Sequence, residues 1–313
     1  MESSREAKRK LFGGGLMKEE TTRAKGQFIF AMMIFGTLGI FIRYIPLPST
    51  VIAEARGILA TLFLLVVVLL RHSSISKEEV KKNFKFLFLS GAAIGINWIL
   101  LFEAYRYTTV STATLSYYMA PVFVILASPF VVKERLTAMK FLCALAAFGG
   151  MVLISGVLTE PGEGGTFKGI GFGLGAAAFY ASVMLLNQFL KDISAYDMTI
   201  TQLGLASLVL LPYTLLTENL SALPWAPVTV ILLTVGIVHT GITYTLYFGS
   251  MHHLQAQTAA LFSYIDPIVA IILSACWLEE PLGFSGIAGA ILILGSTVLS
   301  SFCKKTAAWG SAD

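Results

Sequence analysis

Five ionisable side chains lie inside long apolar runs of the sequence: Glu54, Arg56, Glu103, His239 and Asp266. A charge at the centre of a lipid bilayer costs at least about 2.5 to 3.5 kcal/mol, so an ionisable residue in such a run is a functional candidate by default. A carboxylate can hold a cation or exchange a proton, a guanidinium can hold a carboxylate through two hydrogen bonds, and an imidazole can carry a proton. These groups indicate a site that binds a small charged solute.

The depth of each group in its apolar run separates central from shallow candidates. At about 1.5 Å per helical residue, Asp266 is expected near the bilayer midplane, beside a helix break at Pro267. Glu103 stands two residues from a boundary, where its carboxylate can reach water. Structural roles are the alternatives. Asp266 can accept a hydrogen bond from a neighbouring helix, and Arg56 can pair with Glu54 or Glu103.

Aromatic side chains surround the deep carboxylate. Tyr105 and Tyr107 stand at the end of an apolar run, which is typical of an interface belt. Deeper aromatic residues, with Trp98, can form a cage for an ammonium group, and filling gaps between helices is their alternative role. Together with the polar residues, they give a predicted substrate-binding set of Asp266, Glu103, Glu54, Arg56, Asn97, Trp98, Tyr117, Tyr118, Tyr180, His239, Tyr244 and Tyr264.

The composition requires a membrane protein. Of the 313 residues, 56% are hydrophobic and 13% charged, whereas a soluble domain carries roughly 25% charged residues. The mean hydropathy is +0.78. Three cysteines and four histidines are too few for a disulfide framework or a zinc cluster. We therefore expect no metal or cofactor, no nucleic-acid partner and no secreted scaffold.

Ten apolar windows are long enough for helices that cross the bilayer, which need about 20 residues each. They lie near 27–45, 50–70, 84–105, 111–132, 137–157, 167–190, 197–217, 227–249, 256–278 and 282–303. None alternates strictly between apolar and polar residues, as the strands of a β-barrel would. The sequence predicts an all-α membrane protein with ten transmembrane helices.

The basic residues predict the orientation of these spans. Eighteen Lys and Arg residues fall in segments on one side of the predicted spans and three on the other. Because basic residues remain on the cytoplasmic side, both termini are expected in the cytoplasm of a cell-membrane protein. The first 25 residues, which have no apolar core, are expected to form a basic cytoplasmic tail.

The second half of the chain repeats the first at an offset of 146 residues. Tyr118 falls on Tyr264, Pro121 on Pro267, and Glu134 on Glu280. Each copy holds five predicted spans, and an odd number inserts the second copy from the opposite side of the membrane. Inverted repeats are typical of secondary transporters, whose substrate site lies near the midplane between the halves.

These paired motifs resemble the ten-helix, EamA-type members of the drug/metabolite transporter superfamily. The first copy runs from Phe102 through Ala104, Thr108, Ala113, Tyr118, Pro121 and Glu134, and the second from Phe248 through Ala259, Tyr264, Pro267, Glu280 and Pro281; Arg56 and the Ala/Leu-rich run after it also fit. The resemblance covers about residues 26 to 303. It implies a 5+5 bundle that moves a small metabolite, often an amino acid, by alternating access.

The sequence thus predicts a monomeric secondary transporter for a small amine-bearing metabolite, an amino acid or a relative, with a proton as a candidate coupling ion. Its repeats are expected at 26–158 and 167–303, followed by a cytoplasmic tail at 304–313. A transporter of quaternary or other cationic drugs is the alternative within this fold. A channel or an intramembrane enzyme is the alternative from another class, although no protease motif occurs in the spans.

Overall fold

The computed structural model describes residues 2–302 except for 72–73, 132, 134–135, 155–163, 252–261, 264 and 281. The described part of the chain is helical, with no strand. Its elements are α1 (Glu2–Arg43), α2 (Ser49–Leu70), α3 (Lys77–Tyr107), α4 (Val110–Tyr117), α5 (Ala120–Val131), α6 (Ala138–Ile154), α7 (Gly164–Asn187), α8 (Ala195–Thr217), the 3-10 turn η1 (Leu220–Ala222), α9 (Trp225–Leu233), the π-helix η2 (Thr234–Ile242), α10 (Thr243–Met251), α12 (Ile265–Trp277) and α13 (Phe284–Phe302).

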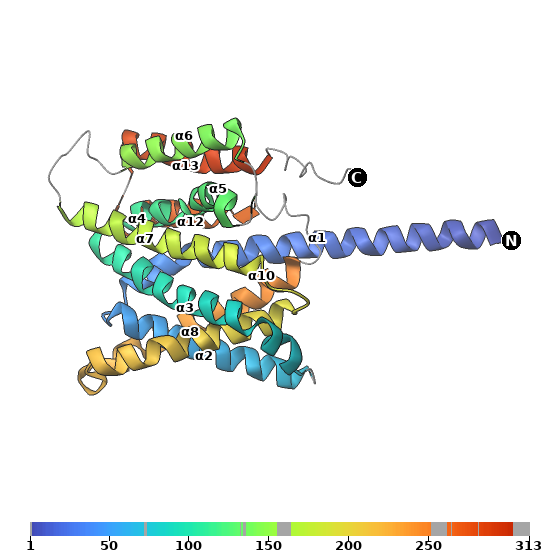
Figure 1. Ribbon diagram of the computed structural model, residues 1–313, viewed down its shortest axis with the longest axis horizontal. Helices are drawn as coiled ribbons and strands as arrows, with labels where there is room; N and C mark the ends of the chain where they lie inside the picture. The colour runs from blue at the N-terminus through green and yellow to red at the C-terminus, as the bar shows by residue number, and fades with distance from the viewer. Residues whose placement is uncertain are drawn as a thin grey trace.

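Seven helical segments of the described residues are long and apolar enough to cross a membrane. They are Thr22–Arg43, Ser49–Leu70, Lys77–Tyr107, Val110–Val131, Phe167–Asn187, Tyr196–Thr217 and Val228–Tyr247. Three further apolar helices are shorter: Ala138–Ile154, Ile265–Trp277 and Phe284–Ser296. The first part of the predicted span 256–278 and the boundaries at 158 and 303 lie outside the described residues. α1 begins at Glu2, so the basic segment expected as a tail continues the first helix (Figure 1).

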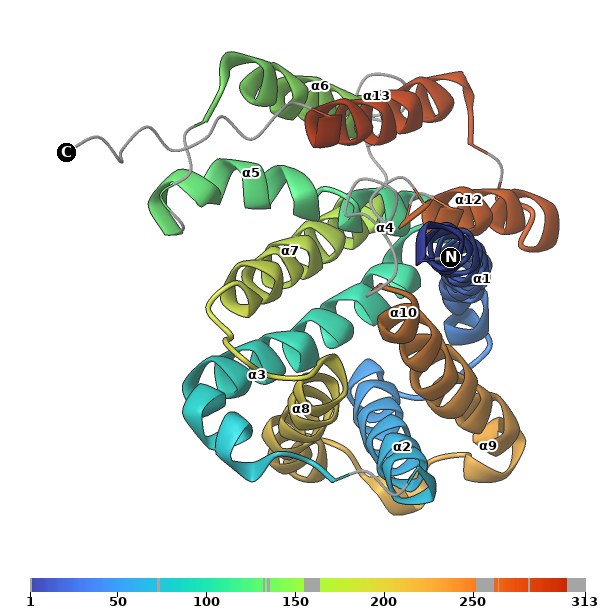
Figure 2. The same ribbon diagram turned by 90° about the vertical axis from the view of Figure 1, so that its right-hand side faces the viewer.

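The helices form one bundle with a distinct pair at its edge. α6 and α13 lie side by side there, next to α4, α5 and α12 (Figures 1 and 2). The remaining helices make up the other part, in which α3 packs against α7 and α8, and α2 packs against α8 and η2. α1 joins the two parts because it contacts both α10 and α12.

Side chains at three helix starts satisfy backbone groups that a helix leaves free. Ser76 Oγ accepts from the Glu79 amide at 3.4 Å, Thr109 Oγ1 from the Thr112 amide at 3.1 Å, and Ser194 Oγ from the Asp197 amide at 3.0 Å. Ser and Thr are preferred N-cap residues for this reason. These caps fix where α3, α4 and α8 begin.

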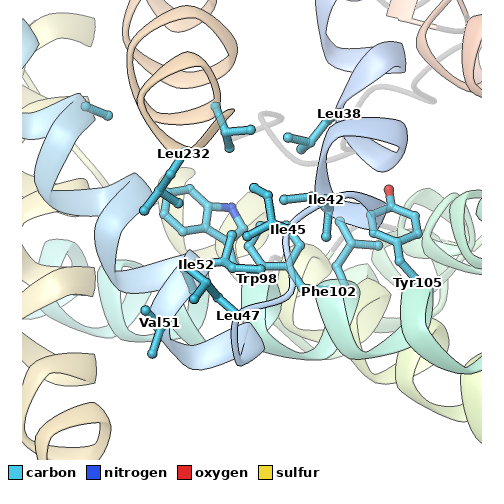
Figure 3. Packing of buried hydrophobic residues seen from close by; sticks show 14 of the residues in the cluster. Leu38, Ile42, Ile45, Leu47, Val51, Ile52, Trp98, Phe102, Tyr105 and Leu232 are labelled. Atoms are coloured by element: carbon cyan, nitrogen blue, oxygen red, sulfur yellow. The ribbon is translucent and has the colours of Figure 1, made fainter. Parts of the chain in front are cut away.

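The largest buried cluster joins the end of α1, the start of α2 and the second half of α3. It includes Leu38, Ile42, Leu47, Ile52, Trp98, Phe102 and Tyr105 (Figure 3). Lipid tails are as apolar as leucine, so helices in a bilayer associate through close packing rather than escape from water. The cluster therefore fixes α2 against α3 and sets the position of the polar residues beside it.

Glycine allows the edge pair to approach closely. A Cβ at Gly150 of α6 would lie 2.7 Å from the Gly289 backbone oxygen, and a Cβ at Gly289 of α13 would lie 2.5 Å from the Gly150 oxygen. Real side chains do not tolerate such distances to a backbone atom. The crossing of α6 and α13 thus requires small residues at both positions.

Two segments near the candidate site depart from a regular α-helix, namely the predicted fourth span and η2. The predicted fourth span is divided at Tyr118 and Met119 into α4 and α5, and Pro121 stands in the first turn of α5. Proline lacks the amide that would continue a helix but suits a helix start. η2 is a π-helix, a form that is rare and frequently marks functional sites.

Candidate functional site

Arg56 is a buried cation that faces the π-helix. Its Nε donates to Thr240 Oγ1 at 2.6 Å, and its Cζ lies 4.4 Å from the centre of the Trp98 ring. The Phe102 ring is 5.8 Å away on the same helix as Trp98. Within the described residues the guanidinium forms no ion pair, and its two terminal nitrogens form no hydrogen bond. Arg56 is therefore held in place by an aromatic ring and a hydroxyl, with its charge available to a bound anion.

The π-helix orients the partners of Arg56. Thr240 Oγ1 donates to the Val235 oxygen at 3.0 Å, five residues back along the chain. A five-residue interval is the hydrogen-bonding interval of a π-helix, so the hydroxyl is positioned by the irregular turn itself. Glycines at 236 and 241 allow α2 to pack directly on η2, because added Cβ atoms there would meet Leu59 and Phe63. Thr240 is a contact that the sequence did not predict.

His239 joins η2 to α1. Its Nε2 lies 2.8 Å from Thr37 Oγ1, its Nδ1 lies 3.4 Å from the Thr234 oxygen, and its ring centre is 4.6 Å from that of Phe41. Both ring nitrogens thus have protein partners and the ring is buried. This geometry is that of a helix-packing histidine, the alternative to a proton carrier.

Asp266 lies beside the break between α4 and α5. It occupies the first turn of α12, and its Oδ2 accepts a hydrogen bond of 2.9 Å from the Tyr118 hydroxyl at the α4–α5 break. The same hydroxyl lies 3.1 Å from the Ser263 oxygen. α1 passes close by, since a Cβ at Gly36 would lie 2.6 Å from the Asp266 backbone oxygen. Broken helices are typical of substrate sites in secondary transporters.

Five tyrosines lie near the cation, the carboxylate or both, and we call them the tyrosine cluster: Tyr105, Tyr117, Tyr118, Tyr180 and Tyr244. The Tyr117 ring stacks on Tyr180 at 5.2 Å and meets Tyr118 edge-on at 6.2 Å. Three members of the cluster, Tyr105, Tyr117 and Tyr244, lie near Arg56. Four lie near Asp266, namely Tyr105, Tyr117, Tyr118 and Tyr180. Tyr105 and Tyr117 are thus near both charged residues, which form no ion pair with each other.

Tyr105 was expected in an interface belt, but the structure buries it. Its side chain is 5% exposed, and its hydroxyl lies 3.5 Å from Thr114 Oγ1. Tyr107 fits the belt expectation better, because it is partly exposed and stacks on Phe172 at 5.6 Å. Spacing along α3 separates the two, since neighbours two residues apart point to opposite sides of a helix.

Four predicted residues lie apart from this arrangement or outside the described residues. Asn97 Nδ2 donates to the Ala176 oxygen at 2.6 Å and so ties α3 to α7. Glu103 forms an ion pair with Arg106, at 3.6 Å. Glu54 stands about 200° around α2 from Arg56, at 100° per residue. Arg56 therefore pairs with neither Glu54 nor Glu103, the two partners expected if its role were structural. Tyr264 lies outside the described residues.

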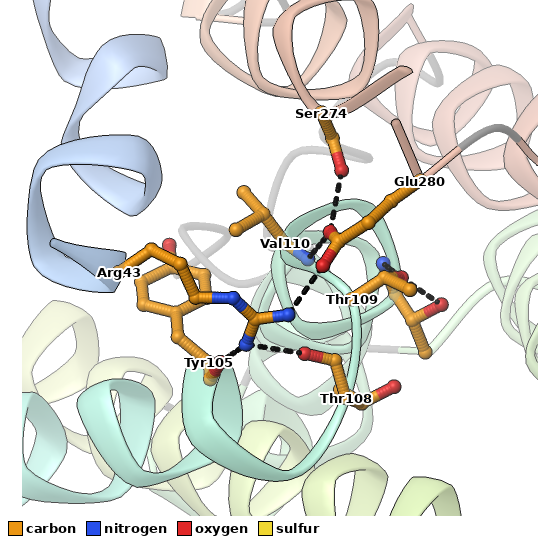
Figure 4. A network of polar contacts seen from close by, with 8 residues as sticks. Arg43, Tyr105, Thr108, Thr109, Val110, Ser274 and Glu280 are labelled. Atoms are coloured by element: carbon orange, nitrogen blue, oxygen red, sulfur yellow. Dashed lines mark hydrogen bonds and ion pairs between the residues drawn. The ribbon is translucent and has the colours of Figure 1, made fainter. Parts of the chain in front are cut away.

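A polar network joins the end of α1 to neighbouring helices near Tyr105 of the tyrosine cluster (Figure 4). Arg43 at the end of α1 forms an ion pair with Glu280 and donates to the backbone oxygens of Tyr105 and Thr108. Glu280 Oε2 accepts from the Val110 amide and from Ser274 Oγ, each at 3.0 Å. This Arg43–Glu280 network links α1, α3, α4 and α12. The sequence related Glu280 only to Glu134 of the other repeat. It used Arg43 only as one of the basic residues that predict the orientation of the spans.

Comparison with known proteins identifies the family. A model described as the EamA-like transporter family matches residues 26–156 and again residues 167–302. The chain belongs to the EamA-like transporter family. It is accordingly a multi-pass membrane transporter, as the paired motifs of the sequence implied.

Relatives of this EamA-like transporter carry transporter names. It is 30% identical over 266 residues to an uncharacterized transporter, YxxF, of Bacillus subtilis (strain 168), covering 82% of this chain and 83% of that protein. It is 31% identical over 198 residues to an uncharacterized transporter of Archaeoglobus fulgidus, covering 63% and 69%. These names are consistent with a protein that is not an enzyme.

A solved structure titled "Crystal structure of protein" shares the fold. It superposes with a TM-score of 0.63 at 16% sequence identity, covering 89% of the EamA-like chain and 97% of the solved one. At this identity the likeness concerns the arrangement of helices alone.

Proposed function

We propose that this EamA-like transporter is a secondary active transporter for a small zwitterionic, amine-bearing metabolite such as an amino acid. One observation carries the proposal: Arg56 and Asp266 both lie near the tyrosine cluster, and Arg56 forms no ion pair with a described residue. Arg56 would receive the substrate carboxylate through its free terminal nitrogens. Asp266 and the tyrosine hydroxyls would receive the ammonium group.

A transporter of quaternary ammonium compounds is less well supported by this geometry. The Trp98 ring, the strongest candidate wall of an ammonium cage, already carries the Arg56 guanidinium at 4.4 Å. A second cation against that ring would meet the repulsion of the first. The tyrosines near Asp266 are left as the aromatic surface for an amine, which suits a zwitterion whose carboxylate neutralises Arg56.

We further propose ten spans, arranged as inverted repeats at 26–158 and 167–303. Backbone geometry supports the repeat: Lys133 and Glu279, which are 146 residues apart, both have positive φ, 58° and 56°. α5 and α12 start at nearly equivalent positions, each with a proline in its first turn. The pairs α2–α8 and α6–α13 join helices that the same offset relates.

The proposed orientation puts both termini and the tails 1–25 and 304–313 in the cytoplasm of a monomer in the cell membrane. It places the Arg43–Glu280 network at the outer end of the bundle. Alternating access requires this end to open and close around a central site. We infer that the network is the outer gate and that it is closed here, with Arg43 released from Glu280 when the gate opens.

Binding and transport measurements test the proposal in order. Purified protein is heated with L-phenylalanine, putrescine, tetraethylammonium or succinate at two pH values, because a ligand that binds the folded state raises its Tm by mass action. We expect the zwitterion to raise the Tm and succinate to leave it unchanged. A rise with succinate alone would contradict an amine-bearing substrate.

A further inference from the structure

Glu54 lies in a second interface, between α2 and α8. One turn before it, Thr50 Oγ1 donates to Glu218 Oε1 at 2.9 Å, and one turn after it Gly57 packs against Ser207 so closely that an added Cβ would clash with Oγ. Residues 50, 54 and 57 share one face of a helix. Glu54 therefore faces α8, on the opposite side of α2 from the face that carries Arg56 to η2.

Several polar atoms of this interface have no partner. Both carboxylate oxygens of Glu54, the Ser207 hydroxyl and the Thr214 hydroxyl are buried without a hydrogen bond to any described residue. The residues are 6%, 8% and 2% exposed. Ser207 and Thr214 are seven residues apart on α8 and so share one face, and Glu218 follows directly after the helix. Glu54 and Thr214 thus lie between two contacts that fix the interface at both ends.

A carboxylate in such a place has nothing to balance its charge. An isolated ionised group in apolar surroundings costs several kcal/mol and is neutralised by taking up a proton instead. No cation of the described residues forms an ion pair with Glu54. The charged and titratable groups on the elements packed against α2 have other partners or lie away from Glu54. On and just after α8, Asp197 accepts from the Ser76 amide, Tyr213 is exposed, and Glu218 bonds Thr50. On η2 and α3, His239 bonds Thr37 and Glu103 pairs with Arg106.

We propose that Glu54 carries an exchangeable proton at a site separate from the substrate site of Arg56 and Asp266. The proton bonds to a Glu54 oxygen in the closed arrangement. When α2 and α8 move apart, it leaves to water at the Thr50–Glu218 end of the interface. The carboxylate that remains is then hydrated by the water that enters between the two helices. The protonation of Glu54 does not depend on the proposed transport function. Its role in coupling proton movement to transport does rest on that function.

Infrared spectroscopy tests the protonation directly and without a substrate. The band of protonated carboxyl groups is recorded at pH 7 for the wild type, for Glu54→Gln and for a matched control, Glu78→Gln, whose glutamate is exposed in the first turn of α3. We expect part of the band to disappear in Glu54→Gln and none in Glu78→Gln. A band that is identical in all three proteins would overturn the proposal.

A second measurement needs no variant and covers a Glu54→Gln protein that does not fold. Wild-type protein labelled with ¹³C at the glutamate carboxyl groups should show part of the protonated band shifted by the isotope. An unshifted band would mean that no glutamate is protonated at pH 7 and would overturn the proposal.

Transport separates the coupling role from the proposed function. In proteoliposomes, Glu54→Gln should lose accumulation of L-phenylalanine driven by a pH gradient and keep exchange of labelled for unlabelled L-phenylalanine. Asp266→Asn should lose both. Accumulation that persists in Glu54→Gln would overturn the coupling role. A wild type that moves no amine-bearing probe would contradict the proposed function, while the infrared result still decides the proton site.

Discussion

Replacing Glu280 by glutamine should open the outer end of the bundle. The change keeps the shape of the side chain but removes the negative charge that pairs with Arg43. A hydrogen bond to a charged group contributes about 1.5–3 kcal/mol, and the side chains are 31% and 16% exposed, so water and salt weaken the pair. We expect the closed state to lose about 1–2 kcal/mol, which raises the open population about 5–30-fold.

Cysteine labelling in detergent measures this population without regard to sidedness. The native cysteines are replaced, and Ser111, which is fully buried one residue beyond Val110 in α4, becomes the single cysteine. We expect a water-soluble maleimide to react about 5–30-fold faster in the Glu280→Gln background, by the same population shift. Glu279→Gln is the matched control, because Glu279 is an exposed neighbour outside the network. Equal rates in the two backgrounds would refute the gate.

Three further perturbations follow from the structure. Asp266→Asn should abolish uptake of L-phenylalanine with little change in Tm, and uptake at the wild-type rate with unchanged pH dependence would make Asp266 a structural residue. Trp98→Ala should weaken uptake of L-phenylalanine, because the guanidinium loses the ring that holds it, and the expected cost is about 0.5–2 kcal/mol in affinity; an effect confined to tetraethylammonium would instead support an ammonium cage. Gly150→Ala should lower the Tm through overpacking of about 1–3 kcal/mol against the Gly289 oxygen, whereas Gly149→Ala, with open space at that position, should not; equal Tm values for the two variants would contradict the crossing.

The sequence identified the membrane class and the family, and it supplied the two charged residues on which the proposed site depends. Arg56 and Asp266 were recognisable because charge is costly in an apolar run and because proline marks a helix start. Tyr118 could be named from the repeat, and it does meet Asp266. These signals are local, so they can be read without knowing which helices are neighbours.

Other parts of the site depend on which helices pack together, which the sequence does not reveal. Glu54 and Arg56 are two residues apart, yet one faces α8 and the other η2. The π-helix that positions Thr240 has no signature in an apolar run of this kind. Arg43 counted only as one of the three basic residues on one side of the predicted spans, and its link to Glu280 bridges 237 positions of the chain.

Uptake by Arg56→Gln proteoliposomes tests the central claim most directly. Wild-type and variant protein are compared with labelled L-phenylalanine and with labelled tetraethylammonium, alongside Glu78→Gln as a control distant from the site. The account predicts that Arg56→Gln loses uptake of the amino acid and leaves any uptake of tetraethylammonium, which has no carboxylate, largely unaffected. Uptake of L-phenylalanine at the wild-type rate in Arg56→Gln would show that the buried guanidinium does not receive a substrate carboxylate.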